Sequence, residues 1–514
     1  MKISILGGGT SGWITALYAQ KARPFDEVTL IESPVIGILG AGEGTTPQII
    51  NLFDFLEIPA SDIIKQCQAT IKTSIRFSGW SGKNSSYHHP FLSRGPVSTK
   101  TPREKLNYYI EKSTEDYFLY NAAAGYPRDH FILAEKLENQ YKVPFIKTYL
   151  NPDSSIVNAI QQYESLSDWA LHFDARLLAE FLQNVAISRG VRHVTGLVTN
   201  VSQDEKGNIS HIHLEDHTLE TDFIFDCSGF KSFISNNIFK SKRTSHRQYL
   251  PADKAQAFFI DSDPLKLPAY TDSVCMDAGW MWKIPLQHRY GCGYVYSSEF
   301  TTEEQVVKDI KEQYPNALIG KSFSFPSDHL VDIWYKNCLS VGLSTGFIEP
   351  LEATSIFHII RILGRFFSEP LNIECRYEPD IKSFNKKWRS EIQEIIDFIH
   401  LHYLSSGTKS AFWNSFRNIT QMPEFIENIL EISKYRPPNE DDFYGREMFT
   451  YPSYTHVLYG NGLLTNDVLK NYYYKLPTPR VNQYSNNLNN QYTAAENCVL
   501  HHDFLLDLKQ SIFS

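Results

Sequence analysis

The chain has 514 residues, a net charge of −9 and a pI near 6.0, with 42% hydrophobic and 21% charged residues. This composition is typical of a globular protein large enough to form two or more lobes. The acidic balance argues against a nucleic-acid surface and the lack of any run of 18 apolar residues argues against a membrane span, so we expect a cytoplasmic protein.

The first 32 residues predict a dinucleotide-binding unit. An apolar strand leads into Gly-x-Gly-x-x-Gly, which comprises Gly7, Gly9, Thr10, Ser11 and Gly12, and a helix and a second strand follow. Gly7 permits the tight turn, Gly9 lets the backbone approach a pyrophosphate, and Gly12 lets helix and strand pack closely. About 20 residues further on, Glu32 can bond a ribose 2′-hydroxyl and would repel a 2′-phosphate. The unit therefore predicts FAD or NAD rather than NADP, the alternative being a purely structural turn.

A second glycine-rich segment, with Gly42 and Gly44, precedes an apolar helix at residues 48–56. It predicts a flexible loop whose backbone can approach a flat ligand. Residues 70–80 then alternate, with Ile71 and Phe77 on one face and Lys72 on the other, which predicts a half-buried strand. A lysine on the polar face of such a strand is ordinarily solvated.

The rest of the chain alternates strands and helices before it becomes mainly helical. Residues 81–158 read as an insertion on the substrate side, and residues 174–189 as an amphipathic helix. Two strands flank a turn at residues 206–208, and another runs through residues 223–229. Residues 324–363 read as strand, glycine turn and helix, and residues 471–497 as a loop. The seven cysteines have neither CxxC nor zinc spacing, so no metal site is expected.

Two further segments suggest chemistry. Trp280 and Trp282 alternate on a strand and form a rigid wall, either in the core or beside a ligand. Pro350 suits the start of a helix whose first N–H groups, near Thr354 and Ser355, could bind an anion. Glu352 could simply complement the dipole of that helix.

Taken together, these segments resemble the flavin-dependent halogenases of the tryptophan-halogenase family. The likeness covers most of the chain: the glycine motif, and residues 40–47, 67–80, 172–175, 226–230, 279–285 and 346–356. The sequence Gly-Trp-x-Trp-x-Ile-Pro at residues 279–285 is the family's own signature. Flavin hydroxylases share the glycine motif but lack this signature.

The resemblance implies an α/β fold in two parts. Residues 1–385 would form the FAD-binding and catalytic module, Rossmann-like with an inserted sheet and with the insertion at about 81–158. Residues 386–514 would form a mainly helical substrate lobe. The implied FAD contacts are Gly7, Gly9, Thr10, Ser11, Gly12, Glu32, Gly42, Gly44, Val198, Leu343 and Ile356. A homo-oligomer is compatible with this organisation.

The resemblance also implies a reaction. Reduced FAD from a separate flavin reductase, together with oxygen and chloride, bromide or iodide, would yield hypohalous acid that travels to Lys72. Lys72 would present the halogen to an electron-rich indole or phenol, and Glu352 would assist. The N–H groups of Thr354 and Ser355 would hold the halide. Trp280 and Trp282 would separate flavin from substrate.

The substrate residues are less fully matched. His89-Pro90-Phe91 resembles the family's His-x-Phe substrate segment, and Tyr454 lies where tryptophan-specific members hold the amino acid's backbone. No clear match to that amino-acid grip is present near Tyr454, so free tryptophan is not expected to be the best substrate. Ala353 and Ser355 stand where the family often has Ser and Gly, which leaves halide preference open. The alternatives are an FAD-dependent aromatic hydroxylase and a flavin-binding protein without catalysis.

Overall fold

The computed structural model describes residues 1–33, 42–91, 119, 121–125, 128, 132–147, 159–369, 371–404, 409–417, 422–473 and 495–510. Its class is α/β, as expected. Within the described ranges, none of the helices combines the length and hydropathy needed to cross a bilayer.

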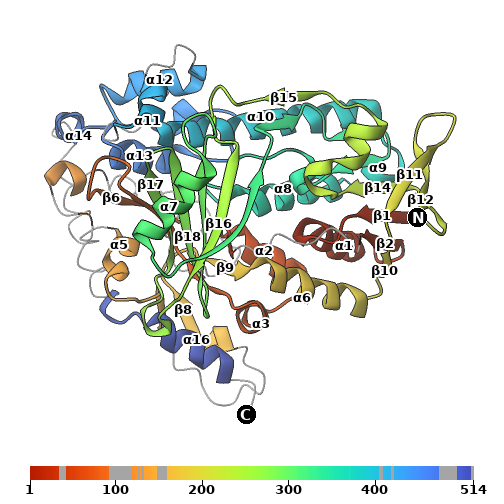
Figure 1. Ribbon diagram of the computed structural model, residues 1–514, viewed down its shortest axis with the longest axis horizontal. Helices are drawn as coiled ribbons and strands as arrows, with labels where there is room; N and C mark the ends of the chain where they lie inside the picture. Colours follow the sequence, from red (N-terminus) through yellow and green to blue (C-terminus); the bar gives the residue numbers. More distant parts are fainter. Residues whose placement is uncertain are drawn as a thin grey trace, which may run out of the picture.

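A parallel sheet holds the N-terminal unit (Figure 1). Its six strands are ordered β10-β2-β1-β14-β23-β22, and all neighbours are parallel except β22 and β23. The strands are β1 (Lys2–Leu6), β2 (Glu27–Glu32), β10 (Arg192–Thr195), β14 (Phe223–Asp226), β22 (Trp334–Tyr335) and β23 (Cys338–Ser340). Near-continuous apolar runs in β1, β2 and β14 suit strands covered on both faces. Helices α1 (Thr10–Ala22) and α6 (Ala175–Ser188) pack against each other beside this sheet.

A seven-stranded sheet forms the centre of the molecule (Figure 1). Its order is β20-β16-β19-β18-β17-β5-β6, and only β17 and β5 run parallel. The strands are β5 (Ser74–Ser78), β6 (Ser86–Pro90), β16 (Lys254–Ile260), β17 (Tyr270–Met276), β18 (Gly279–Pro285), β19 (Tyr290–Tyr296) and β20 (Leu318–Ser324). Strand β18 therefore lies inside the sheet, and it carries both tryptophans of the signature.

The strand expected at residues 70–80 is divided in two. Strand β4 (Thr70–Lys72) joins β3 (Gly42–Gly44) and β9 (Ala170–Asp174) in a small sheet of order β3-β9-β4, whereas β5 joins the large sheet. Between them, the N–H of Thr73 donates to the carbonyl oxygen of Ala269. Two expectations are therefore wrong. Gly42–Gly44 is paired strand rather than loop, and Lys72 is fully buried because β4 is enclosed on both faces.

Other predicted elements are confirmed. Helix α6 begins after Asp174, whose carboxylate accepts from the N–H groups of Arg176 and Leu177. Strands β11 (Val198–Gln203) and β12 (Ile209–Leu214) flank the predicted turn. Helix α8 (Thr354–Ser368) follows the glycine turn. Most of the insertion at 81–158, and residues 474–494 of the expected C-terminal loop, lie outside the described residues.

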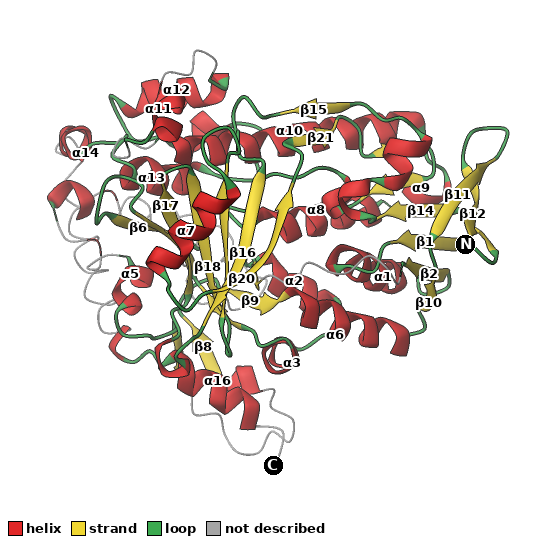
Figure 2. Ribbon diagram, in the orientation of Figure 1, coloured by secondary structure: helices red, strands yellow, loops and turns green. Residues whose placement is uncertain are grey.

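The C-terminal part is mainly helical, as predicted. It contains α10 (Glu378–Tyr403), α11 (Ala411–Arg417), α12 (Glu424–Ser433), α13 (Tyr451–Gly460) and α14 (Asn466–Tyr473). Figure 2 shows α11 to α14 gathered on one side of the molecule, beside the seven-stranded sheet. The predicted division between residues 385 and 386 falls within α10.

Candidate active site

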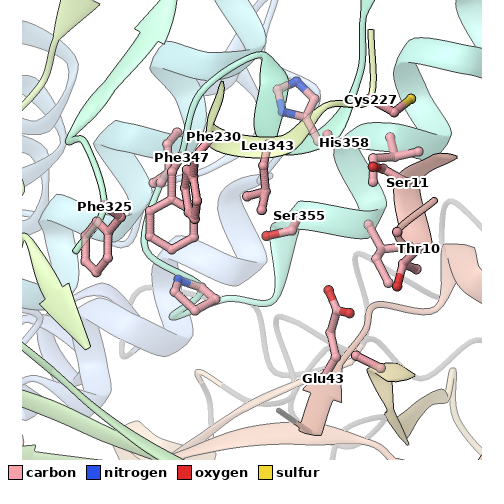
Figure 3. Close-up of a pocket in the computed structure, with 18 of the residues that line it drawn as sticks. Thr10, Ser11, Glu43, Cys227, Phe230, Phe325, Leu343, Phe347, Ser355 and His358 are labelled. Carbon is pink, nitrogen blue, oxygen red and sulfur yellow. The ribbon is translucent and has the colours of Figure 1, made fainter. Parts of the chain in front are cut away.

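A cavity of about 920 Å³ lies between the parallel sheet, the seven-stranded sheet and α8. Its lining includes the glycine motif and Lys72. Figure 3 shows a polar side with Thr10 and Ser11, and an aromatic side with Phe230, Phe325 and Phe347. A space with these two characters suits a ligand that carries both phosphates and a flat ring system.

The glycine motif has the geometry of a phosphate cradle. Gly7 has a φ of +119°, and a Cβ there would lie 2.2 Å from the carbonyl oxygen of Cys227. A Cβ on Gly12 would lie 1.9 Å from the carbonyl oxygen of Gly7. By contrast, a Cβ on Gly9 would meet no protein atom within 4 Å. Gly7 and Gly12 therefore build the turn, while Gly9 leaves open space where the helix N-terminus can receive an anion.

Glu32 ends β2 beside this loop. Its carboxylate lines the cavity and lies 3.1 Å from Nε2 of His193. A Cβ on Gly8 would come within 2.2 Å of the Glu32 carboxyl carbon. The backbone of the glycine motif and the Glu32 carboxylate are therefore close enough to contact the pyrophosphate and the ribose of one ligand.

The other predicted cofactor residues lie on the same cavity. These are Thr10, Ser11, Gly42, Gly44, Val198, Leu343 and Ile356; Gly12 supports the loop without lining the cavity. The open cradle at Gly9 and the acid at Glu32 fit the adenosine half of FAD, and the aromatic side accommodates a larger ring system.

Glu43 is a cavity residue that sequence reasoning missed. It extends its carboxylate from β3 into the cavity (Figure 3). Burial raises the pKa of Glu43 to about 7. The sequence did contain one indication of this position, because Glu43 lies between two glycines that were expected to contact the ligand. Near neutral pH this carboxyl can hold or release a proton inside the cavity.

Trp280 and Trp282 form the wall that their spacing predicts. Both line the cavity, with ring centroids 6.2 Å apart. The indole Nε1 of Trp280 donates to Oε2 of Glu349 at 2.8 Å, and the Tyr403 hydroxyl donates to the same oxygen. Burial raises the pKa of Glu349 to about 7, although these two hydrogen bonds oppose the rise. The two indoles are also part of the main core, as one of the two interpretations of their spacing expects.

Lys72, the last residue of β4, lines the same cavity as the glycine motif and the two tryptophans. Its Nζ donates to the carbonyl oxygen of Thr45 at 2.9 Å and lies 5.3 Å from the ring centroid of Phe91. Burial lowers the pKa of Lys72 to about 7, against the opposing effect of the Glu352 charge. Near neutral pH a large fraction of this amine is therefore unprotonated and nucleophilic.

His172 lies near Lys72, and no role for it was predicted from the sequence. Thr70 donates its hydroxyl hydrogen to the carbonyl oxygen of Pro285 at 2.7 Å, so its Oγ1 accepts from Nδ1 of His172 at 3.1 Å. Nε2 of His172 then accepts from Thr271 at 2.9 Å. Burial lowers the pKa of His172 well below its usual value, and the nearby Lys72 lowers it further. The neutral ring adds no positive charge next to the lysine.

Glu352 is held between two histidines. Its Oε2 lies 2.8 Å from Nδ1 of His89 and its Oε1 lies 2.8 Å from Nε2 of His402. Burial alone would raise the pKa of Glu352, but the two imidazoles outweigh it and hold the pKa at about 2. His402 was not predicted, because its distance from the other motifs along the chain hides the contact. The carboxylate thus has a fixed orientation.

The predicted substrate residues separate into two groups. His89 contacts Glu352, and the ring of Phe91 lies near Lys72, so this segment lies beside both proposed catalytic residues. Tyr454 is fully buried among Phe398, Phe425 and Phe443, and it does not line the cavity. The structure therefore places Tyr454 in the core of the helical part rather than at the lysine.

Thr354 and Ser355 open α8 at the cavity wall. Ala353, immediately before them, has a left-handed φ of 55°. The first N–H groups of any α-helix lack an intrahelical acceptor and favour an anion. This helix end lies on the same cavity as the glycine motif, whereas Glu352 is held by its histidines.

Known proteins are similar to this chain in sequence and in fold. Residues 2–473 match the family model for tryptophan halogenases. The tryptophan 7-halogenase RebH of Lentzea aerocolonigenes is 31% identical over 492 residues, which cover 90% of each chain. The structure of the tryptophan 6-halogenase SttH of Streptomyces toxytricini has a TM-score of 0.86 at 26% identity and covers 98% of this chain and 99% of that one.

A second structure, that of the flavin-dependent halogenase BrvH from Brevundimonas sp. BAL3, has a TM-score of 0.79 at 28% identity and covers 99% of both chains. The likeness extends along nearly the whole chain. From the open cradle at Gly9 to the wall on β18, the cavity fits the flavin that such enzymes require. The chain therefore belongs to the tryptophan-halogenase family and is a flavin-dependent halogenase.

Proposed function

We propose that this enzyme halogenates an electron-rich aromatic ring, of the indole or phenol type, through Lys72. Bound reduced FAD would supply the oxidising chemistry that, with oxygen and a halide ion, yields hypohalous acid. The remaining steps belong to the protein's own residues. Chloride, bromide and iodide are all candidate halides, and a separate flavin reductase would supply the reduced cofactor.

One observation carries this proposal: the Lys72 amine opens onto the same cavity as the glycine motif and is buried enough to be partly neutral. A neutral amine can attack the electrophilic halogen of hypohalous acid. The N–Cl or N–Br bond forms as the halogen–oxygen bond breaks, and water leaves with the amine proton. An ammonium can only donate a hydrogen bond to the acid.

The surrounding residues have supporting roles. The N–H groups of Thr354 and Ser355 would hold the halide, while Trp280 and Trp282 would separate cofactor from substrate. His89 and Phe91 would border the aromatic substrate next to Lys72. Glu352, ionised and fixed by His89 and His402, would stabilise the positive charge that develops on the ring and receive the proton that the ring loses.

The substrate is expected to be an aromatic compound other than free tryptophan. Tyr454, the residue nearest the family's amino-acid grip, is enclosed in an apolar core and does not line the cavity that holds Lys72. This arrangement supports recognition of the aromatic ring by His89 and Phe91 rather than of an amino-acid backbone by Tyr454. Regiospecific halogenation of free tryptophan ahead of every other indole or phenol would overturn this part.

The test is to incubate the protein with FAD, a flavin reductase and each halide against a panel of indoles, phenols and pyrroles. Mass spectrometry should find halide-dependent halogenated products. A halide-independent gain of one oxygen atom would instead indicate an aromatic hydroxylase. Halide-independent hydrogen peroxide without any aromatic product would indicate a flavin-binding protein that has lost halogenation.

A further inference from the structure

The helix α16 (His501–Gln510) brings a histidine to the strand of Lys72. Helix α16 contacts α3 (Ala60–Gln66) and lies close to the C-terminus in Figure 1. His501 is its first residue and is fully buried. The helix lies beyond residues 2–473, the part that matches the family model.

His501 accepts a backbone hydrogen bond from the residue before Lys72. The N–H of Ile71 donates to Nε2 of His501 at 3.0 Å. Nδ1 of the same ring lies 3.1 Å from the carbonyl oxygen of Leu267. A carbonyl oxygen only accepts, so Nδ1 carries the hydrogen and Nε2 presents its lone pair to Ile71. The contact therefore requires this tautomer and a neutral ring.

This hydrogen bond satisfies a backbone N–H on the side of β4 that has no neighbouring strand. Strand β4 has three residues and pairs with β9 on one side only, at the edge of its sheet. A buried N–H on the open side needs another acceptor, because an unpaired buried N–H loses its hydrogen bond to water without replacement. His501 supplies that acceptor at Ile71, directly before the residue whose amine must stay in the cavity.

The helix is held by contacts that do not involve His501. Phe504 stacks on Phe145 with ring centroids 4.5 Å apart, and Leu508 is fully buried. Asp507 accepts from the Tyr163 hydroxyl at 2.6 Å and pairs with Lys147 at 2.6 Å. A change at His501 can therefore remove the hydrogen bond to Ile71 while α16 stays docked.

We propose that His501 is a positioning residue for Lys72: its Nε2 fixes the edge of β4 and thereby keeps Nζ at the carbonyl oxygen of Thr45. The proposal rests on the role given to Lys72 under the proposed function. Without this acceptor, β4 frays and the halogen is presented less often and less selectively. The glycine motif and its cofactor are left as they were.

The test compares two amides at one position. The amide nitrogen of asparagine can take the place of Nδ1 and keep the contact with Leu267, but asparagine is too short to reach Ile71. The amide oxygen of glutamine can take the place of Nε2. His501→Asn should therefore break the bond to Ile71, and His501→Gln should preserve it. His502→Asn, at the neighbouring and more exposed position, is the control.

Two measurements decide the outcome. Hydrogen exchange, read by mass spectrometry on a peptide containing Ile71, should be faster in His501→Asn than in the parent, His501→Gln or His502→Asn. Halogenated product per reduced flavin oxidised should fall about 10- to 100-fold in His501→Asn only, with a less selective mixture of isomers and an unchanged flavin oxidation rate.

Unchanged exchange and product yield in His501→Asn would overturn the proposal, provided that Lys72→Ala abolishes halogenation. Loss of product in both amide variants alike would also overturn it, because Gln keeps the acceptor. If Lys72→Ala retains selective halogenation, the proposed function itself fails, and the exchange of Ile71 then shows separately whether His501 holds the strand.

Discussion

The Nε2 atom of His402 lies 2.8 Å from Oε1 of Glu352, while Nδ1 of the same ring faces the carbonyl oxygen of Phe398 at 2.8 Å. Because the carbonyl can only accept, Nδ1 carries a hydrogen. The ring is therefore oriented by Phe398, and its Nε2 faces Glu352. The Glu352 carboxylate near Lys72 is thus held against a buried histidine.

We predict that His402→Leu lowers the rate of halogenation about 100-fold, because Glu352 loses one of the two groups that fix it. FAD binding should be unchanged. The matched control is His400→Leu, on the same helix, where the buried ring instead contacts the carbonyl oxygen of Tyr249. Steady-state kinetics on both variants would make the comparison, and equal losses would assign the effect to packing alone.

The rate of halogen transfer should rise with pH around neutrality. Burial lowers the pKa of Lys72 to about 7, so the amine changes from mostly protonated to mostly neutral as pH increases through that value. Removing the Glu352 charge in Glu352→Gln should move the midpoint to lower pH, because that charge favours the ammonium. The midpoint is measured for both proteins from the rate of product formation in single-turnover experiments between pH 5.5 and 9. A rate that falls through this window would contradict the neutral-amine step.

Gly9→Val should abolish FAD binding without unfolding the protein. A Cβ at Gly9 meets no protein atom within 4 Å, so the side chain occupies only the space intended for the pyrophosphate. Gly12→Val is the contrast, because its Cβ would lie 1.9 Å from the carbonyl oxygen of Gly7 and must disturb the fold as well. Calorimetric titration with FAD and thermal melts of the apoprotein separate the two effects. Normal FAD affinity in Gly9→Val would show that the cofactor lies elsewhere.

Apolar patterns in the sequence located β1, β2, β14 and α6, and the C-terminal part is mainly helical as expected. The other strands of the parallel sheet are only two to four residues long, which is too short to carry a regular pattern. Periodicity failed at residues 70–80, since alternation cannot show that β4 and β5 join different sheets at Thr73. The burial of Lys72 followed from that division. The resemblance to the family singled out Lys72 and Glu352 as candidate site residues. The contacts of His402, His172 and His501 could not be predicted, because they join parts of the chain that are far apart in the sequence.

Acid should destabilise the protein between about pH 6.5 and 4. Burial lowers the pKa of His501 to about 4 and that of His172 well below the ordinary value of 6.5. These rings fold neutral, so their contribution to stability is complete above 6.5 and is lost as the unfolded chain takes up protons at lower pH. Urea denaturation at several pH values should show a falling free energy of unfolding across this window, and a smaller fall in His501→Gln.

Halogen transfer is expected to depend most on Lys72, and replacing this residue tests that role directly. Lys72→Ala removes the buried amine but leaves the glycine motif, Glu32 and the first turn of α8 in place. Flavin reoxidation, followed by absorbance, and halogenated product, followed by mass spectrometry, are measured in the same reactions. In Lys72→Ala, flavin should be reoxidised at a rate similar to the parent, and halogenation by escaped acid should be at most weak and unselective. Regioselective halogenation at the parental rate would contradict this prediction and return Lys72 to the role of a buried structural residue.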